Sequence, residues 1–440
     1  MKAHLRVKLA PNAHVDEPIP YWEDVIDDKS IAKTSFYRPV DDVFARYGIP
    51  IWVTREYRPI ADAFDADEIA AGLNRIYRLI LQRDEAVPPA LVRDVQLVPT
   101  VEYARVGQIG VSDLPPSQPV EMSVTTDRRS REAVYLDEAH AFSHGDPSVT
   151  VAVLDTGVEL DHPELQQVLV PGYDFVDIID GAGRFLGDFL GADDVPEDEV
   201  GHGTHVAGII GGKGLAMPEG VVPGCKLLPV RVLGALQKGE RRIGAGLIDN
   251  INNGIKWAVD HGADVINMSL GVAPVGGELP HEEVIEYARQ KGVSVVAASG
   301  NDGSSVSRYF PGALPYVVTV GAFDDAGEVA SFSTYGETID FVAPGTNVYS
   351  SFLDKGYAFS SGTSHATPFV SGGIALLHSF ARKRGSRLTD KQVKYVLRNT
   401  ADRLDNRFRN LKAGFGRLNL VDAVRLLDHK LNRTESAYAT

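Results

Sequence analysis

Cysteine is nearly absent from this sequence, since Cys225 is the only one among 440 residues. A single cysteine cannot form an intrachain disulfide, which excludes a small domain stapled by disulfides. Long apolar runs are missing too, because no stretch approaches the roughly 20 apolar residues of a membrane-spanning helix. Residues 1–30 show no apolar run followed by a small-residue cleavage site, the pattern of a signal peptide. We therefore expect a cytoplasmic protein without a membrane span.

Basic residues are in deficit, because 44 Lys and Arg stand against 59 Asp and Glu, giving a net charge of −15. Nucleic-acid affinity comes mainly from Lys and Arg that neutralise phosphates, so we expect no nucleic-acid partner. Hydrophobic residues make up 44% of the chain. That fraction is ordinary for a folded protein and excludes a disordered chain, and the length indicates two or three domains.

A segment rich in Pro, Ser, Thr and charge, residues 110–132, predicts an exposed connection between two domains. Before it, residues 66–82 carry apolar side chains at helical spacing, which predicts a helix. The strands expected in the same region are residues 4–10, 51–58 and one or two within 95–111. We therefore expect a small N-terminal α+β domain at residues 1–120, followed by a linker at 121–135.

After the linker, near-continuous apolar runs alternate with helical patterns. The expected strands are residues 149–155, 226–233, 264–270, 293–299 and 316–323. Helical spacing is clearest at residues 246–262 and 280–292. Apolar strands that alternate with helices indicate an α/β domain whose mainly parallel sheet is covered by helices on both faces. In such sheets the chemistry gathers beyond the carboxyl ends of the strands.

Four polar residues stand where apolar segments begin or end. Asp155 ends a buried strand, where an unpaired carboxylate is costly, and His202 and Ser364 stand at the starts of helices. Asp, His and Ser supply the orienting group, the base and the nucleophile that amide hydrolysis needs. Asn301 follows another strand and offers an amide donor for an oxyanion. Taken singly, Asp155 and Ser364 also fit capping positions, and His202 also fits a core position.

The motifs LDTGVELDHPEL, GHGTHVAGI, INMSLG, AASGND and SGTSHATP occur in this order and closely resemble those of the subtilisin-like serine peptidases. The resemblance covers residues 136–427, leaving residues 428–440 as a tail. It implies a three-layer α/β catalytic domain and a serine endopeptidase, often made as a zymogen. It assigns Asp155 as the orienting carboxylate, His202 as the general base and acid, Ser364 as the nucleophile and Asn301 as the oxyanion donor.

The resemblance also implies two groove strands that bind a peptide or protein substrate in extended conformation. Its groove residues are Gly244, Ala245 and Gly246 on one edge and Ser269, Leu270 and Gly271 on the other. The primary specificity pocket is expected to involve Ala298, Ser299, Gly300 and Tyr309. Tyr309 replaces a residue that is often small in the family, which predicts a narrowed or reshaped pocket.

Other positions depart from the family pattern. His365 follows the nucleophile where Met is common, which adds a titratable ring. Glu164 matches a calcium ligand of secreted relatives, but the loop at residues 211–220 has no Asn or Asp to complete that site. We therefore expect no required cofactor and assign no metal ligand, with calcium kept as an alternative at a degraded site, and we interpret His205 as structural. The acidic residues 188–199 fit a solvated loop, a subsite for basic substrates or a cation site.

Two questions stay open at this point. The N-terminal domain fits either a prodomain that docks on the catalytic groove or a permanent module that binds a partner. The acyl-enzyme chemistry fits hydrolysis, but it also fits a transpeptidase or macrocyclase, and a binding-only pseudoprotease is the third alternative. Substrate, pathway and oligomeric state do not follow from the motifs.

Overall fold

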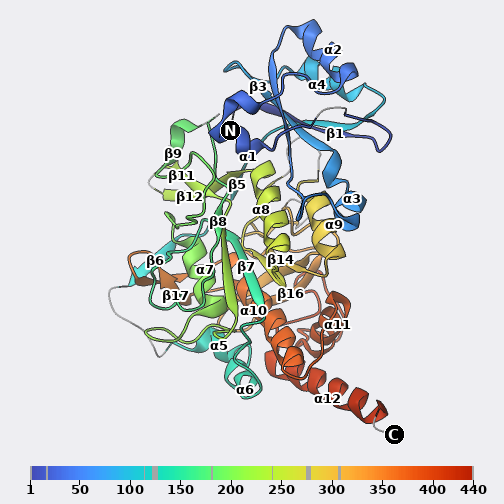
Figure 1. Ribbon diagram of the computed structural model, residues 1–440. Helices are drawn as coiled ribbons and strands as arrows, with labels where there is room; N and C mark the ends of the chain where they lie inside the picture. Colours follow the sequence, from blue (N-terminus) through green and yellow to red (C-terminus); the bar gives the residue numbers. More distant parts are fainter. Residues whose placement is uncertain are drawn as a thin grey trace.

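The chain forms two domains that are built on separate sheets (Figure 1). The computed structural model describes residues 2–15, 18–112, 114–120, 127–179, 182–239, 241–273, 279–305 and 309–438, with the backbone alone for residue 241 and residues 434–438. No helix among these residues is long and apolar enough to cross a membrane. In Figure 1 the N-terminal domain lies above the larger domain, and the C-terminal helix points away at the opposite end.

A four-stranded antiparallel sheet in the order β2-β3-β1-β4 organises the N-terminal domain. Its elements are β1 (His4–Leu9), α1 (Trp22–Asp27), η1 (Lys29–Ile31), α2 (Arg38–Tyr47), β2 (Ile51–Arg55), α3 (Ala66–Ala71), η2 (Leu73–Arg75), β3 (Ile76–Leu81), α4 (Pro89–Gln96) and β4 (Val101–Val106). Helices α2 and α4 bury their apolar faces against one side of the sheet. The strands expected from the sequence within this domain are confirmed.

The helix expected at residues 66–82 is wrong. The α-helix stops at Ala71 because Gly72 adopts a left-handed conformation with φ of 76°, which ends a helix. A single 3₁₀ turn follows, and residues 76–81 then form β3, whose six side chains are all buried. Apolar residues on both faces of a buried strand also satisfy helical spacing, so the periodicity alone could not separate the two structures.

Seven parallel strands in the order β16-β15-β14-β13-β7-β10-β8 form the central sheet of the larger domain. They are β7 (Thr150–Asp155), β8 (Tyr173–Asp174), β10 (Lys226–Arg231), β13 (Val265–Met268), β14 (Ser294–Ala298), β15 (Val318–Phe323) and β16 (Ile339–Pro344). The larger helices are α7 (His202–Gly211), α8 (Ile248–Asp260), α9 (Glu282–Gln290), α10 (Thr363–Arg382), α11 (Asp390–Thr400) and α12 (Leu420–Tyr438). Short turns of helix add α5 (Arg129–Glu132), α6 (Leu136–His140) and η3 (Ala182–Arg184).

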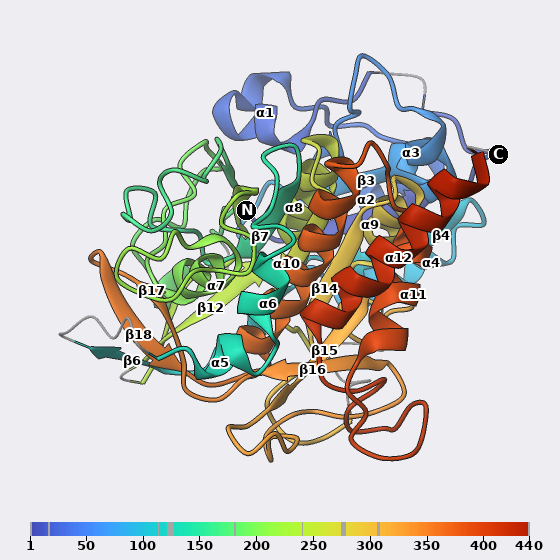
Figure 2. The same ribbon diagram turned by 90° about the horizontal axis from the view of Figure 1, so that it is seen from below.

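Successive side chains of β7 point to opposite faces of the sheet, and each face packs in a different layer of the core. Val151 and Val153 pack in the cluster that includes α7, α10 and α12, whereas Ala152 and Leu154 pack in the cluster that includes α8 and α9. Figure 2 shows α10 and α12 on one side of the sheet and α8 and α9 beyond it. The expected three-layer α/β architecture is therefore confirmed, as are the five strands and the two helices predicted in this domain.

Two small antiparallel sheets join residues 109–112 and 117–120 to the larger domain. The first, in the order β5-β12-β11-β9, contains β5 (Ile109–Ser112), β9 (Phe185–Leu186), β11 (Gly234–Lys238) and β12 (Arg241–Leu247). The second, in the order β17-β18-β6, contains β6 (Ser117–Val120), β17 (Val348–Phe352) and β18 (Gly356–Ser360). The exposed connection predicted for this segment is thus replaced by two paired strands, while residues 121–126 of the expected linker lie outside the described residues.

The N-terminal sheet also packs against α8 and α9 through a buried polar cluster. His4 Nε2 lies 2.9 Å from Oδ2 of Asp249 on α8, and Tyr103 donates to Glu283 on α9 at 2.7 Å. Arg78 forms an ion pair with Glu56 inside the domain and donates to Asn250 on α8. These buried contacts, and a core cluster shared between the N-terminal domain and α8 and α9, make the two domains a continuous packed unit.

Candidate active site

An ion pair joins the end of a central strand to the start of a helix. Asp155 is the last residue of β7, and His202 is the first residue of α7. The Nδ1 atom of His202 lies 2.7 Å from Oδ1 of Asp155, and both side chains are almost fully buried. The same Oδ1 accepts the N–H of Thr156 at 2.8 Å. The carboxylate therefore fixes the ring orientation and places the proton on Nδ1, leaving Nε2 as the basic nitrogen.

A buried carboxylate that the motifs did not identify holds the start of α7. Asp198 accepts from the hydroxyl of Thr156 at 2.8 Å, from the N–H of Gly201 at 2.9 Å and from both N–H and hydroxyl of Thr204. Its negative charge lies at the positive end of the helix, and burial raises its pKa. Asp198 therefore positions the helix that carries His202, and the Asp-rich sequence around it hid this role.

The other acidic side chains near His202 divide between structure and solvent. Glu199 pairs with Arg231, which also binds Asp174, so this part of the segment is a salt-bridge network. Asp193 and Asp194 stay exposed. Of the three alternatives for residues 188–199, the solvated loop does not describe Asp198, which is buried, or Glu199, which is half-buried and paired with Arg231.

Ser364 is the second residue of α10 and is 3% exposed. Its carbonyl accepts the hydroxyl of Ser269 at 2.7 Å, which ties the helix start to the groove strand after β13. Among the described residues, Nε2 of His202 has no hydrogen-bond partner. Serine hydrolases commonly tighten the contact between nucleophile and base only when substrate binds, so this geometry is compatible with catalysis.

Asn301 is oriented by a residue that the sequence motifs did not single out. Its Oδ1 atom accepts the N–H of Thr363 at 2.8 Å and the Thr363 hydroxyl at 2.9 Å. Because the oxygen is engaged on both contacts, the Nδ2 group is the end left to donate. Nδ2 lies near Gly362, the residue before α10, because a Cβ added to that glycine would be 3.4 Å from it. A signal for Thr363 existed in the sequence, since it is adjacent to Ser364.

Three of the four predicted pocket residues, Ala298, Gly300 and Tyr309, line a small cavity of about 140 Å³ beside Ser364. Its lining includes Ala298, Gly300, Asn301, Tyr309, Ser364 and the groove strand Ser269, Leu270 and Gly271. The ring of Tyr309 lies against Gly300, where an added Cβ would come within 2.6 Å of it. Ser299 is fully buried and does not line the cavity, so the structure does not bring this predicted residue to the pocket.

The opposite groove strand is occupied by the protein's own chain. Gly244, Ala245 and Gly246 lie in β12, and each pairs in antiparallel register with a residue of β5. The partners are Ser112, Val111 and Gly110, in that order. Ser112 and Leu114 also line the cavity beside Ser364, and the N–H of Gly271 donates to the Ser112 hydroxyl at 3.4 Å. Motif reasoning missed this contact because an edge strand can pair with any extended segment.

The ring of His365 lies between those of His202 and His205, tilted to the first and edge-on to the second. The His365 ring lies 5.3 Å from that of His202 and 4.5 Å from that of His205, centroid to centroid. Burial is the main cause that lowers the pKa of His205 to about 3 and that of His365 well below its usual range, with the neighbouring rings acting in the same direction. His205 also contacts the carbonyls of Val348 and Ala358 at 3.1 Å, so it ties α7 to β17 and β18.

The residues around Glu164 do not fit a calcium ion. Its carboxylate accepts the backbone N–H groups of Leu215 and Ala216 at 3.0 and 2.6 Å, and Tyr357 donates its hydroxyl at 3.3 Å. Calcium requires six to eight oxygen ligands, whereas these neighbours present hydrogen-bond donors to the carboxylate. The loop after α7 therefore satisfies Glu164 with its own backbone.

Comparison with known proteins identifies the family. The sequence profile described as Peptidase_S8, subtilase family, matches residues 146–416. The chain belongs to the subtilase family. The thermophilic serine proteinase of Bacillus sp. (strain AK1) is 35% identical over 340 residues, which cover 76% of this chain and 75% of that protein. The major intracellular serine protease of Bacillus subtilis (strain 168) is 39% identical over 255 residues, covering 56% and 73%.

Solved subtilase structures resemble the fold as well. The prenylagaramide maturation protease PagA aligns with a TM-score of 0.54 and 31% identity, covering 67% of this chain and 98% of its own. A protease from Pseudoalteromonas arctica gives a TM-score of 0.57 and 30% identity, covering 67% and 94%. This protein is a subtilisin-like serine endopeptidase that acts on peptide substrates, in a family in which zymogens are typical.

Proposed function

We propose that this subtilase hydrolyses peptide bonds through an acyl-enzyme on Ser364, and that the described part of residues 109–120, which leaves out residue 113, blocks its groove until it is displaced or cut. The acyl-enzyme proposal rests on the 2.7 Å contact between Asp155 and His202 and on the position of Ser364 at the start of α10. The pairing of β5 with β12 carries the second part.

The proposed chemistry follows from the acceptor left on His202. Nε2 removes the proton of Ser364 as the hydroxyl oxygen attacks the substrate carbonyl, and Asp155 stabilises the imidazolium that results. The tetrahedral oxyanion accepts the Nδ2–H of Asn301 and the backbone N–H of Ser364. His202 then returns the proton to the leaving amine, and water repeats the sequence on the acyl-enzyme. Thr363 contributes by holding the amide of Asn301 in the donating orientation.

The proposed inhibition uses the path of the chain from the N-terminal domain. The described part of this path pairs with β12 before Leu114 and with β18 after Pro116, in the extended conformation that a bound substrate would take. Leu114 is 3% exposed and lines the cavity beside the nucleophile. An incoming peptide needs the same edge of β12, and it must therefore displace residues 109–112.

The polar cluster between the domains supports this proposal. It places buried ions and hydrogen bonds at the junction, and breaking one partner of a buried ion pair is strongly destabilising. The N-terminal domain is thus held on α8 and α9, which keeps residues 109–120 at a high effective concentration near the groove. A prodomain and a permanent inhibitory module share this geometry, and they differ in whether the chain is cut.

Intact-mass measurement distinguishes these outcomes. The protein and its Ser364→Ala variant are purified in parallel and incubated with a chromogenic peptide. We expect the active protein to lose its N-terminal segment, with activity rising as it does so, and the variant to stay intact and inactive. If both stay full length while the active form cleaves peptides at a constant rate, the blocking role of residues 109–120 is refuted. Cyclic or ligated products would indicate transfer to an amine in place of hydrolysis.

A cytoplasmic location is also proposed. The major intracellular serine protease of Bacillus subtilis is among the relatives, and the only cysteine, Cys225, is buried and free. A protein without disulfides needs no oxidising compartment. Cell fractionation with an antibody against the chain tests this, and recovery from the medium or periplasm would contradict it.

A further inference from the structure

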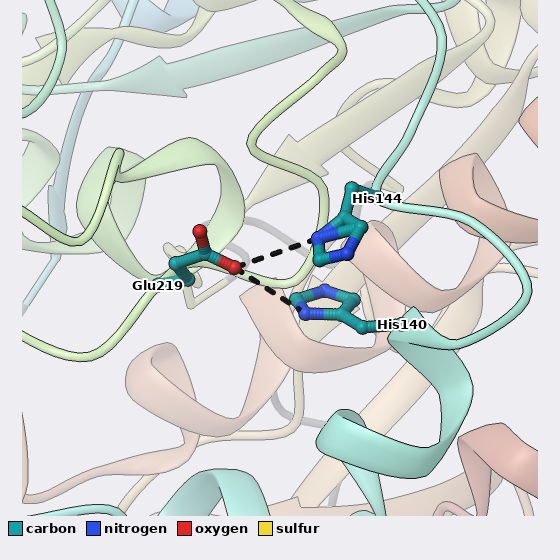
Figure 3. A group of neighbouring side chains, drawn as sticks. All are labelled: His140, His144 and Glu219. Atoms are coloured by element: carbon teal, nitrogen blue, oxygen red, sulfur yellow. Dashed lines mark ion pairs between the residues drawn. The ribbon is translucent and has the colours of Figure 1, made fainter.

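Outside the catalytic site, three side chains direct potential metal-ligand atoms toward one point (Figure 3). His140 ends α6, His144 lies in the loop that follows, and Glu219 comes from the loop after α7. Their ligand atoms all lie within 4.8 Å of one another. His140 and His144 are four residues apart, a spacing that zinc ligands use, but Glu219 is distant from them in sequence, so the motifs did not reveal the set.

The distances fit a small tetrahedral ion. Oε2 of Glu219 lies 3.5 Å from Nδ1 of His140 and 3.5 Å from Nδ1 of His144. Zinc binds histidine nitrogen and carboxylate oxygen at about 2.0–2.2 Å in tetrahedral geometry, which places neighbouring ligand atoms roughly 3.3–3.6 Å apart. Both distances from the Glu219 oxygen to the histidine nitrogens therefore already match those between two ligands of one zinc ion.

A backbone hydrogen bond also fixes the tautomer of His140 that can bind a metal ion. Its Nε2 atom lies 3.0 Å from the carbonyl oxygen of Val221, which can only accept, so Nε2 carries the proton. The lone pair is then on Nδ1 and faces the carboxylate of Glu219. A histidine ligand whose second nitrogen donates to a backbone carbonyl is the usual arrangement in zinc sites. Two acceptors that face each other need a cation or a proton between them.

Access and support are both present. The His140 side chain is 7% exposed, whereas those of His144 and Glu219 are 57% and 42% exposed, so the ion and a water ligand can reach the site from solvent. A backbone hydrogen bond holds the loop that carries His144, because the N–H of Gly224 donates to the carbonyl of His144 at 2.8 Å. Little rearrangement is needed to bring the three ligands together.

We propose that His140, His144 and Glu219 bind one Zn²⁺ ion, with water as the fourth ligand. Two imidazoles and one carboxylate suit zinc, whereas calcium and magnesium prefer oxygen ligands throughout. The ion joins the loop after α6 to the loop after α7, the helix that begins with His202. It would connect two segments on the side of the sheet where α7 and α10 pack, and the water ligand leaves one position open to exchange. This site does not depend on the proposed blocking of the groove.

Zinc titration of the full-length Ser364→Ala protein tests the site, because that variant cannot digest itself. The protein is treated with a chelator, dialysed and titrated with ZnCl₂ in a calorimeter. We expect one zinc ion per chain, with affinity reduced at least tenfold by His144→Ala and by Glu219→Gln. His429→Ala, which removes an exposed histidine outside the cluster, is the matched control and keeps the parent affinity.

Thermal unfolding gives a second readout. A ligand present at one hundred times its dissociation constant raises the melting temperature of a chain of this size by about 3 °C. We expect that rise in the parent and in His429→Ala, and none in His144→Ala, whose metal-free melting temperature equals that of the parent. Parent protein that binds no zinc, or cluster variants that bind it as tightly as the parent, would overturn the assignment.

Discussion

Gly110 offers a direct way to loosen the chain segment that occupies the groove. It lies in β5 opposite Gly246, and a Cβ at this position would come 2.5 Å from Cγ1 of Val272. Val272 is fully buried and stiff at χ1, so it cannot swing away. A Gly110→Ala substitution must therefore move β5 away from Val272 and disturb its pairing with β12.

The expected size of the effect follows from overpacking, which costs about 1–3 kcal/mol. If that cost destabilises only the state in which β5 is paired with β12, the fraction of molecules with an unoccupied groove rises about 5- to 150-fold. The apparent dissociation constant of a competing peptide is inversely proportional to the open fraction. A groove that is mostly closed in the parent should thus bind the peptide more tightly by the same factor.

Binding is measured by fluorescence anisotropy with a labelled extended peptide in the Ser364→Ala background, where nothing is cut. Gly183→Ala is the matched control, because an added Cβ there meets no atom within 4 Å. Leu114→Ala is the second variant, since it removes a buried contact beside Ser364 without adding an atom. If both variants fold and bind the peptide no better than the control, residues 109–114 do not block the groove.

Three further predictions concern the catalytic residues and their surroundings. Asn301→Ala should lower kcat about 10²- to 10³-fold, the range measured for a subtilisin that loses its oxyanion-hole side chain, with little change in KM. Steady-state kinetics on the cut enzyme checks this, and an unchanged kcat would remove Asn301 from the mechanism. The His365 ring is neutral in the fold because its pKa lies well below the value of about 6.5 in an unfolded chain. Its contribution to stability is therefore complete above pH 6.5 and is lost as the pH falls, since only the unfolded state takes up the proton. His365→Met should make the loss of unfolding free energy below pH 6.5 shallower by about 1.4 kcal/mol per pH unit, measured by denaturant titration of the Ser364→Ala protein at pH 7, 6 and 5; parallel curves would contradict this. Because backbone N–H groups and a hydroxyl satisfy Glu164, millimolar calcium added to chelator-treated protein should leave the melting temperature unchanged, and a calcium-dependent rise would contradict that expectation.

The sequence determined the central sheet, since its strands are apolar on both faces and are separated by helices of clear periodicity. Both properties belong to short stretches of chain and are visible without a structure. Local order also placed Asp155, His202 and Ser364 at or next to the ends of their elements. The fold joins Asp155 to His202 and brings the ring of His365, the residue after Ser364, beside that of His202. Local patterns failed at residues 66–82, because the left-handed Gly72 ends the helix and turns the chain into a strand.

Only the tertiary structure decided which distant segments meet. The pairing of residues 109–112 with β12 joins a domain connection to a groove edge, and backbone hydrogen bonds leave no mark in the sequence of either strand. Asp198 resembles its acidic neighbours in the sequence, and only burial at the start of α7 distinguishes it. His140, His144 and Glu219 likewise converge through the folding of two loops. Short-range periodicity fixes elements, whereas contacts between segments far apart in the chain depend on packing, which no local pattern records.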